Sequence, residues 1–82
     1  MEKYLNQLAG SQLKKIRLSG GYKPYWVQKV TGICESKLSK IENGKQRLDP
    51  FTLFTLGSLY DITASGFWRI VEIEYVKKYL PK

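Results

Sequence analysis

The side chains best able to do chemistry lie in one short stretch, ICESKLSKIENGK, at positions 33–45. After Cys34, only Leu38 and Ile41 interrupt a run of charged, hydroxyl and amide side chains. Such side chains donate and accept hydrogen bonds, which suits them to contact with a polar ligand. The stretch is therefore either the solvated face of a helix or a surface that binds something.

Positive charge surrounds this stretch. The formal net charge of the chain is +7. Residues 14–47 contain nine lysines and arginines and only two glutamates, so this segment alone carries the excess. A continuous basic segment is typical of a phosphate-binding surface, because lysine and arginine attract phosphates and release their counterions. The alternative is a basic surface that only keeps the protein soluble.

The composition argues against several other classes of protein. The chain has no histidine and one cysteine, and its carboxylates are not clustered. Without a nucleophile–base pair, a glycine-rich phosphate loop or a metal-ligand set, we expect no enzyme, no cofactor and no metal. The longest apolar run is too short for a membrane span, and the first residues do not form a signal peptide. A single cysteine fits a reducing compartment, so we expect a cytoplasmic protein.

At 82 residues the chain has room for one core, so we expect a single domain, residues 1–82, made of about five short helices. Apolar residues at helical spacing predict a first helix that ends at the Gly-Gly pair at 20–21. The Gly-Ser pair at 10–11 is a candidate interruption of it. Pro24 predicts the start of a second helix, PYWVQKVT, which Gly32 ends.

The third helix is expected from about Glu35 to Glu42, with the Asn-Gly pair at 43–44 ending it. The Asp-Pro pair at 49–50 predicts the cap and first residue of a fourth helix, through residue 60. Gly57 in this helix predicts a close approach of two helices, because glycine is costly inside a helix. The residues expected to face the core are Leu53, Phe54, Leu56 and Tyr60.

The last segment, residues 66–80, fits two patterns. As a strand, its apolar residues alternate with glutamates. As a helix, it forms two apolar stripes, the first of Phe67, Trp68, Val71, Tyr75 and Tyr79, the second of Ile70, Ile73, Val76 and Leu80. We favour a helix, because everything before it is helical. The second stripe exceeds what a small core needs, which predicts dimerisation with a second copy of the chain.

The two short helices around Gly32, inside a basic all-α domain, form a helix-turn-helix candidate. In such a pair the second helix exposes its outer face to the major groove, while Leu38 and Ile41 anchor it from beneath. The notable motifs are LKKIR at 13–17, Gly-Tyr at 21–22, VQKVTGI at 27–33, SKLSKIENGK at 36–45 and YDIT at 60–63. In these motifs residues 13–68 resemble the Cro and lambda-type repressors, the xenobiotic-response-element class of helix-turn-helix proteins.

The resemblance implies a DNA-binding core at residues 13–68, with double-stranded DNA as the partner. It makes the start and outer face of the third helix the base-reading residues, which here are Cys34, Glu35, Ser36, Lys37, Ser39 and Lys40. We rank Lys40, Glu35 and Ser36 first. Lysine donates to guanine O6 and N7, glutamate accepts from cytosine N4, and serine does either.

The resemblance also implies residues that bind DNA phosphates, here Lys23, Tyr25, Asn43, Lys45, Gln46 and Arg47. It further implies a partly buried ion pair between Arg17 and Glu42. Such a pair fixes orientation more than it adds stability, and breaking it leaves a charge without its partner. We therefore expect Arg17→Ala to destabilise the fold.

Several positions depart from the family pattern. Gln28 stands where alanine is usual, at the closest approach of the second and third helices, and Pro24 replaces a frequent glutamine. Lys23 is a poor N-cap for the second helix. Cys34 occupies the N-cap of the third helix, where serine is usual, and is either a small polar substitute or a reactive thiol. Trp26 adds aromatic bulk on a face that is usually polar, and it either packs, touches DNA sugars or contacts a partner, with packing as our default expectation.

These features lead to two hypotheses of different classes. The first is a sequence-specific transcriptional regulator, a homodimeric repressor of phage, mobile-element or restriction-controller type that recognises a near-palindromic operator. Such a chain has no room for a ligand-sensing domain, so a small-molecule ligand is not expected and regulation would come from concentration, dimerisation or a separate protein. The second is an antitoxin or protein-interaction module with weak or no specific DNA binding, which would bind a toxin or another protein.

Overall fold

The computed structural model describes residues 2–80, and all regular elements in this range are helices. They are α1 (Glu2–Ser19), α2 (Pro24–Thr31), α3 (Glu35–Glu42), α4 (Pro50–Tyr60) and α5 (Ala64–Tyr79). The predicted all-α class is thereby confirmed, and the strand alternative for residues 66–80 is wrong. No helix in the described range is long and apolar enough to cross a membrane.

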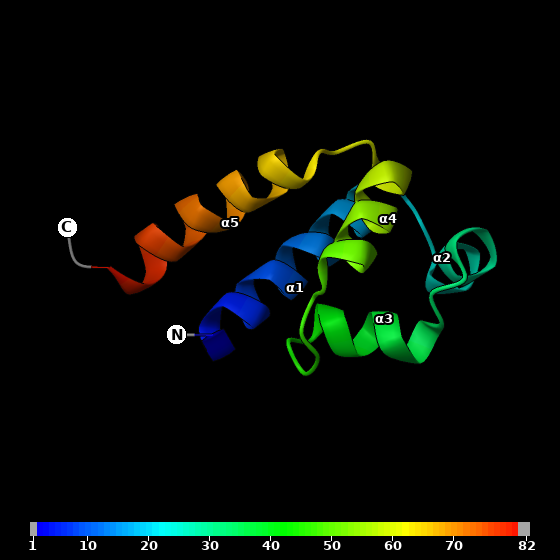
Figure 1. Cartoon of the computed structure of the whole chain (residues 1–82), viewed down its shortest axis with the longest axis horizontal. Helices are drawn as coiled ribbons and strands as arrows, with labels where there is room; N and C mark the ends of the chain where they lie inside the picture. Colours follow the sequence, from blue (N-terminus) through cyan, green and yellow to red (C-terminus); the bar gives the residue numbers. More distant parts are fainter. Residues whose placement is uncertain (1, 81–82) are drawn as a thin grey trace.

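Helix α1 is the common support of the fold, with α3 packed on one side of it and α5 on the other (Figure 1). Helix α2 stands at one end of the molecule, against α3 and α4, and the start of α1 lies near the end of α5 at the opposite end. There the rings of Tyr4 and Tyr79 pack with their centroids 4.7 Å apart. The molecule is therefore elongated, with extents of 43 × 23 × 21 Å.

Every helix contributes a fully buried side chain to one shared core. These side chains are Leu13, Val27, Leu38, Leu56 and Phe67, from α1 to α5 in order. Burial of an aliphatic or aromatic side chain of this size contributes about 1.5–3 kcal/mol to folding. Helix α3, which carries most of the polar stretch at 33–45, is thus anchored to the rest of the molecule from beneath.

Helix α1 runs without a break through Gly10 and Ser11, so the candidate interruption there is wrong. Gly10 instead marks the place where α1 meets the end of α3. A Cβ atom at this position would overlap the carbonyl oxygen of Ile41 and would lie 2.9 Å from that of Glu42. Glycine is required here because two backbones approach each other, and not because the helix ends.

Helix α4 begins as expected. The carboxylate of Asp49 accepts hydrogen bonds from the backbone N–H and the hydroxyl of Thr52, each at 2.8 Å. These two bonds, the N–H first, lower the pKa of the Asp49 carboxyl below its ordinary value. Because an ionised carboxylate suits a helix N-terminus, this cap fixes where α4 starts.

Two expectations for α4 are wrong. Phe54, expected in the core, is 71% exposed, because α4 is apolar on nearly every side and its pattern does not identify the packed face. Gly57 does mark a close approach, but the partner is the turn after α4 and not a second helix. A Cβ atom there would lie 2.6 Å from the carbonyl oxygen of Ile62, whose N–H bonds back to Gly57.

The two apolar stripes of α5 have different surroundings. Of the first stripe, Phe67 and Val71 are buried and the two tyrosines are half-buried against the core, while Trp68 is exposed. The second stripe is exposed throughout, by 37–48%, at Ile70, Ile73, Val76 and Leu80. We call these four residues the α5 stripe. It is an apolar surface that the described chain leaves uncovered.

The hydroxyl of Tyr60 is buried without a hydrogen-bond partner among the described residues. Burial, followed by the charge of Glu42, raises the pKa of Tyr60 from 10.0 to about 12. The folded state therefore favours the neutral phenol, and the stability that depends on it is present below pH 10 and is lost as the pH rises through about 12.

Tyr60→Phe is expected to leave the free energy of unfolding unchanged at pH 7 or to raise it by about 1 kcal/mol, because it removes an unsatisfied buried group. The variant should also lose less stability than the wild type between pH 10 and about 12. Thermal melts of both proteins at pH 7 and across that range measure the difference. A variant clearly less stable than the wild type at pH 7 would show that the hydroxyl has a partner.

Candidate nucleic-acid interface

The turn between α2 and α3 is fixed by its own residues. Gly32 ends α2 with a φ of 81°, and its N–H bonds to the carbonyl of Gln28. Thr31 fixes the backbone that follows Gly32, because its hydroxyl donates to the carbonyl of Val27 at 2.7 Å and accepts from the N–H of Ile33 at 3.1 Å. The angle between the two helices therefore follows from local bonds as well as from packing.

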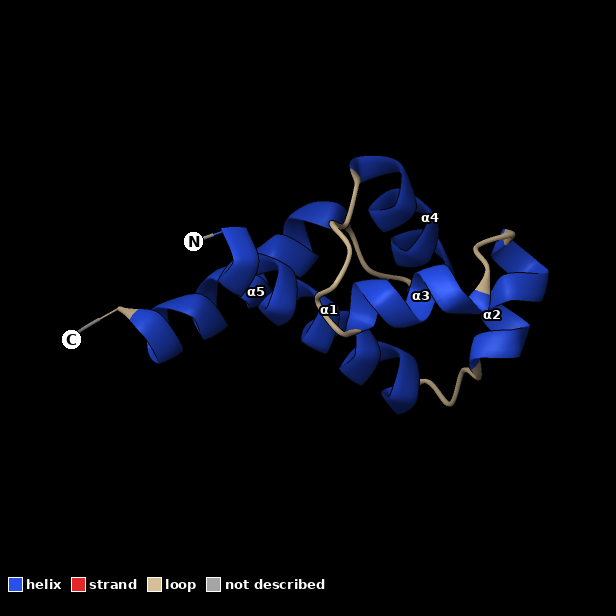
Figure 2. Cartoon of the chain, turned by 90° about the horizontal axis from the view of Figure 1, so that it is seen from below, coloured by secondary structure: helices blue, strands red, loops and turns tan. Residues whose placement is uncertain are grey.

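Helix α3 has two distinct sides. Leu38 and Ile41 are buried beneath it, and the opposite side is open to solvent along the lower edge of the molecule in Figure 1, facing the reader in Figure 2. The exposed residues there are Cys34, Glu35, Ser36, Ser39 and Lys40. We call these five residues the outer face of α3. The structure thus brings together five of the six predicted base-reading residues.

Lys37, the sixth predicted base-reading residue, does not belong to the outer face. It is half-buried, and its Nζ lies 3.9 Å from a carboxylate oxygen of Asp49 at the start of α4. Both side chains remain partly open to solvent, so this ion pair contributes little stability. The ion pair instead directs the side chain of Lys37 toward the start of α4.

The C-terminal end of α3 is tied to α1 by Arg17 and Glu42. The Nε and one terminal nitrogen of Arg17 donate to the two carboxylate oxygens of Glu42, at 2.8 and 3.1 Å. The other terminal nitrogen donates to the backbone carbonyl of Tyr22 at 2.8 Å. Both charged side chains are buried, and the bonds to Glu42 raise the pKa of Arg17. One guanidinium thus joins α1, the loop before α2 and the end of α3.

The N-terminal end of α3 is capped from α2. Cys34 occupies the N-cap position but forms no side-chain cap. The side-chain oxygen of Gln28 accepts the N–H of Glu35 at 2.8 Å instead. The sequence shows Gln28 only as a departure from a pattern, since a bond between residues seven apart on two helices leaves no local signal.

Cys34 is exposed, and its thiol lies 3.3 Å from the hydroxyl of Ser36. This hydroxyl, followed by the nearby backbone N–H of Lys37, lowers the pKa of the Cys34 thiol below its ordinary value. The Cys34 thiol and the Ser36 hydroxyl therefore lie together at the N-terminal end of the outer face.

The predicted phosphate-binding residues lie at several places around the outer face. Lys23 and Tyr25 are exposed at the start of α2, and Lys45 is exposed in the loop after α3. Asn43 is exposed, but its side-chain amide already forms a hydrogen bond within α3, donating to the carbonyl of Ser39 at 2.9 Å. Gln46 is half-buried. Lys14 of α1, not among the predicted site residues, lines a groove with Glu35, Ser39 and Asn43 and adds a positive charge beside α3.

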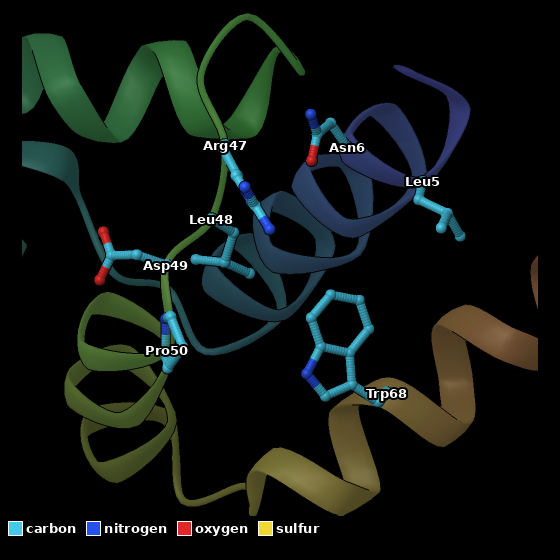
Figure 3. Close-up of a pocket in the computed structure, with 7 residues that line it drawn as sticks. All are labelled: Leu5, Asn6, Arg47, Leu48, Asp49, Pro50 and Trp68. Carbon is cyan, nitrogen blue, oxygen red and sulfur yellow. The ribbon is translucent and has the colours of Figure 1, made fainter. Parts of the chain in front are cut away.

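Arg47 is placed differently from the other predicted phosphate-binding residues. It lines a groove with Leu5, Asn6, Leu48, Asp49, Pro50 and Trp68. Its side chain points away from the α3 ribbon and into this groove, with the indole of Trp68 on the far side (Figure 3). Arg47 is therefore not gathered with the outer face of α3.

Trp26 packs on the neighbouring rings. Its ring stacks on Tyr22 with centroids 5.2 Å apart, and Tyr22 in turn stacks on Tyr60 at 5.4 Å. Offset stacking of this kind contributes about 0.5–1.5 kcal/mol for each pair beyond simple burial. Trp26 thus helps to hold α2 against α4, while part of its surface stays open.

No family model and no curated protein matches the chain. The interpretation of this surface therefore depends on its geometry and charge. It combines a helix with a polar exposed side and a buried apolar side, fixed at both ends, within a segment that carries the whole net charge of +7.

Proposed function

We propose that the chain is a sequence-specific double-stranded DNA-binding regulator, in which α2 and α3 are the two helices of a helix-turn-helix. The observation that supports this most is the two-sided character of α3, whose outer face is polar and exposed while Leu38 and Ile41 are buried. The motif resemblance to Cro and lambda-type repressors covers the same residues. In this proposal the outer face enters the major groove.

The outer face supplies the chemistry that base recognition needs. Lys40 donates to guanine, Glu35 accepts from cytosine, and Ser36 bonds to either. Short side chains at the start of α3 allow its backbone to come close to the base edges. Lys23 and Lys45 flank the face and contact phosphates, which contributes affinity and register but no sequence preference.

The proposed assembly is a homodimer. The α5 stripe is apolar and uncovered in the single chain, and a second copy of the chain is the simplest partner for it. Two copies would place two α3 helices in successive major grooves, about 34 Å apart, on a near-palindromic operator. The regulator would then repress by occupying a promoter in the cytoplasm.

A selection from random DNA duplexes tests this proposal. We expect a palindromic consensus and an affinity that falls steeply with salt, because bound phosphates release counterions. Lys40→Ala should relax the preference at one base pair of each half-site, at a cost of about 1–3 kcal/mol for the preferred base.

Lys45→Ala is the matched control for Lys40→Ala, because it removes the same charge beside the outer face. It should weaken binding to all duplexes alike and make the salt dependence shallower. If Lys40→Ala behaves in the same way as Lys45→Ala, Lys40 contacts a phosphate and not a base. If the wild type selects no duplex at any salt concentration, the proposed function is wrong.

The alternative function is protein binding, as an antitoxin or interaction module. The observation that favours it is the apolar exposure of α2, where Tyr25, Trp26 and Val30 are all open to solvent. A face used for phosphates is expected to be more polar. Indifference to DNA at low salt, together with a stable complex with a second protein through α2, would support this alternative.

A further inference from the structure

Among the described residues, one side chain forms a hydrogen bond to the backbone N–H groups at the start of α3. A helix begins with four N–H groups that have no partner within the helix. In α3 the N-cap residue Cys34 forms no side-chain cap hydrogen bond, although its thiol lies near the N–H of Lys37, and the side-chain oxygen of Gln28 in α2 accepts the N–H of Glu35 at 2.8 Å. The cap of α3 therefore comes from another helix.

The two ends of α3 are held by different bonds. Arg17 fixes the end at Glu42 through a buried ion pair, whereas the bond from Gln28 at the other end is exposed. Glu35 and Ser36, two of the three residues ranked first for base recognition, lie in the turn that Gln28 caps. Loss of the Gln28 amide would leave that turn free to fray while the far end stays fixed.

We infer that Gln28 is a positioning residue that orders the first turn of α3 for base recognition. This inference rests on the proposed function. Gln28 acts through the N–H of Glu35 and thereby sets where the side chains of Glu35 and Ser36 point. It takes over the task that a serine or threonine at position 34 would perform within α3 itself.

A direct test is to remove the cap that α2 provides at Gln28 and to replace it with a cap at position 34 of α3 itself. Gln28→Ala removes the cap from α2, and Cys34→Ser creates one within α3, because a serine hydroxyl at the N-cap accepts an N–H of the same turn. A lost N-cap costs about 1 kcal/mol, which corresponds to about a fivefold change in an equilibrium constant. We therefore compare wild type, both single variants and the double variant.

Binding to the selected duplex should weaken about fivefold when Gln28→Ala is made in the wild type. Because Cys34 belongs to the outer face, Cys34→Ser alone is the reference for the double variant, and Gln28→Ala/Cys34→Ser should bind within about twofold of Cys34→Ser. In the absence of DNA, the amide of Glu35 should exchange its hydrogen faster in Gln28→Ala than in the wild type. A lost cap of this strength should lower the melting temperature of a domain of this size by about 4–8 °C, and the double variant should regain it.

Two results would overturn the inference. One is unchanged affinity of Gln28→Ala, and the other is a loss that Cys34→Ser does not restore, which would indicate that Gln28 touches DNA directly. If the wild type selects no duplex, the proposed function fails and the positioning role fails with it. The exchange of the Glu35 amide still decides the cap in that case, since an unchanged rate in Gln28→Ala would show that Gln28 does not cap α3.

Discussion

Replacing Arg17 by alanine is expected to lower the free energy of unfolding by about 3–5 kcal/mol. The guanidinium forms two bonds to Glu42 and one to the carbonyl of Tyr22, and both charged side chains are buried. Without it, the carboxylate of Glu42 stays buried with no compensating charge. Denaturant unfolding of the variant and the wild type measures the loss.

Lys15→Ala is the matched control, because Lys15 is an exposed basic residue on the same helix. It should change the free energy of unfolding by no more than about 0.5 kcal/mol. The double variant Arg17→Met/Glu42→Leu should be more stable than Arg17→Ala, because it leaves no unpaired charge. A stability of Arg17→Ala equal to that of Lys15→Ala would contradict the assigned role of the pair.

Gly10→Ala is expected to destabilise the fold by about 3 kcal/mol, because the added methyl group overpacks the contact between α1 and α3. The new Cβ atom would overlap the carbonyl oxygen of Ile41 and lie 2.9 Å from that of Glu42. Both obstacles are backbone atoms, which cannot move aside as a flexible side chain would. Thermal and denaturant melts measure this effect.

Helix propensity makes the test of Gly10 sharper. Alanine is favoured over glycine in a helix interior by about 1 kcal/mol, so propensity alone predicts that the variant is more stable. Ser11→Ala, at the exposed neighbouring position, shows the effect of propensity without the overlap. A Gly10→Ala variant as stable as Ser11→Ala would mean that α1 and α3 do not approach as closely as described.

Helix bounds could be predicted from the sequence because the signals are local. A glycine such as Gly32 ends a helix through its own φ, here 81°, and Asp49 caps α4 through a residue three positions later. Neither signal depends on how the helices pack. The division of α3 into an anchored side and an outer face could be predicted for the same reason, because Leu38 and Ile41 are three residues apart on a helix.

Features that depend on contacts between distant segments could not be predicted. Gly10 resembles an interruption because only the folded chain brings Ile41 against it. Phe54 has the same apolar character as its buried neighbours in α4, so nothing local marks it as exposed. In the candidate site, the turn of Lys37 toward Asp49 and the bond from Gln28 to Glu35 are likewise set by the packing of one helix on another.

The cap that α2 provides to α3 also determines how this part of the molecule opens. Helix α2 has only two turns, lacks a side-chain cap at Lys23 and exposes Trp26 and Val30. Short helices with few buried contacts open locally at low free energy. Because fraying of α2 withdraws Gln28, we expect the first turn of α3 to open with it as one unit. We expect the far end of α3, held by Arg17, to stay closed in such events.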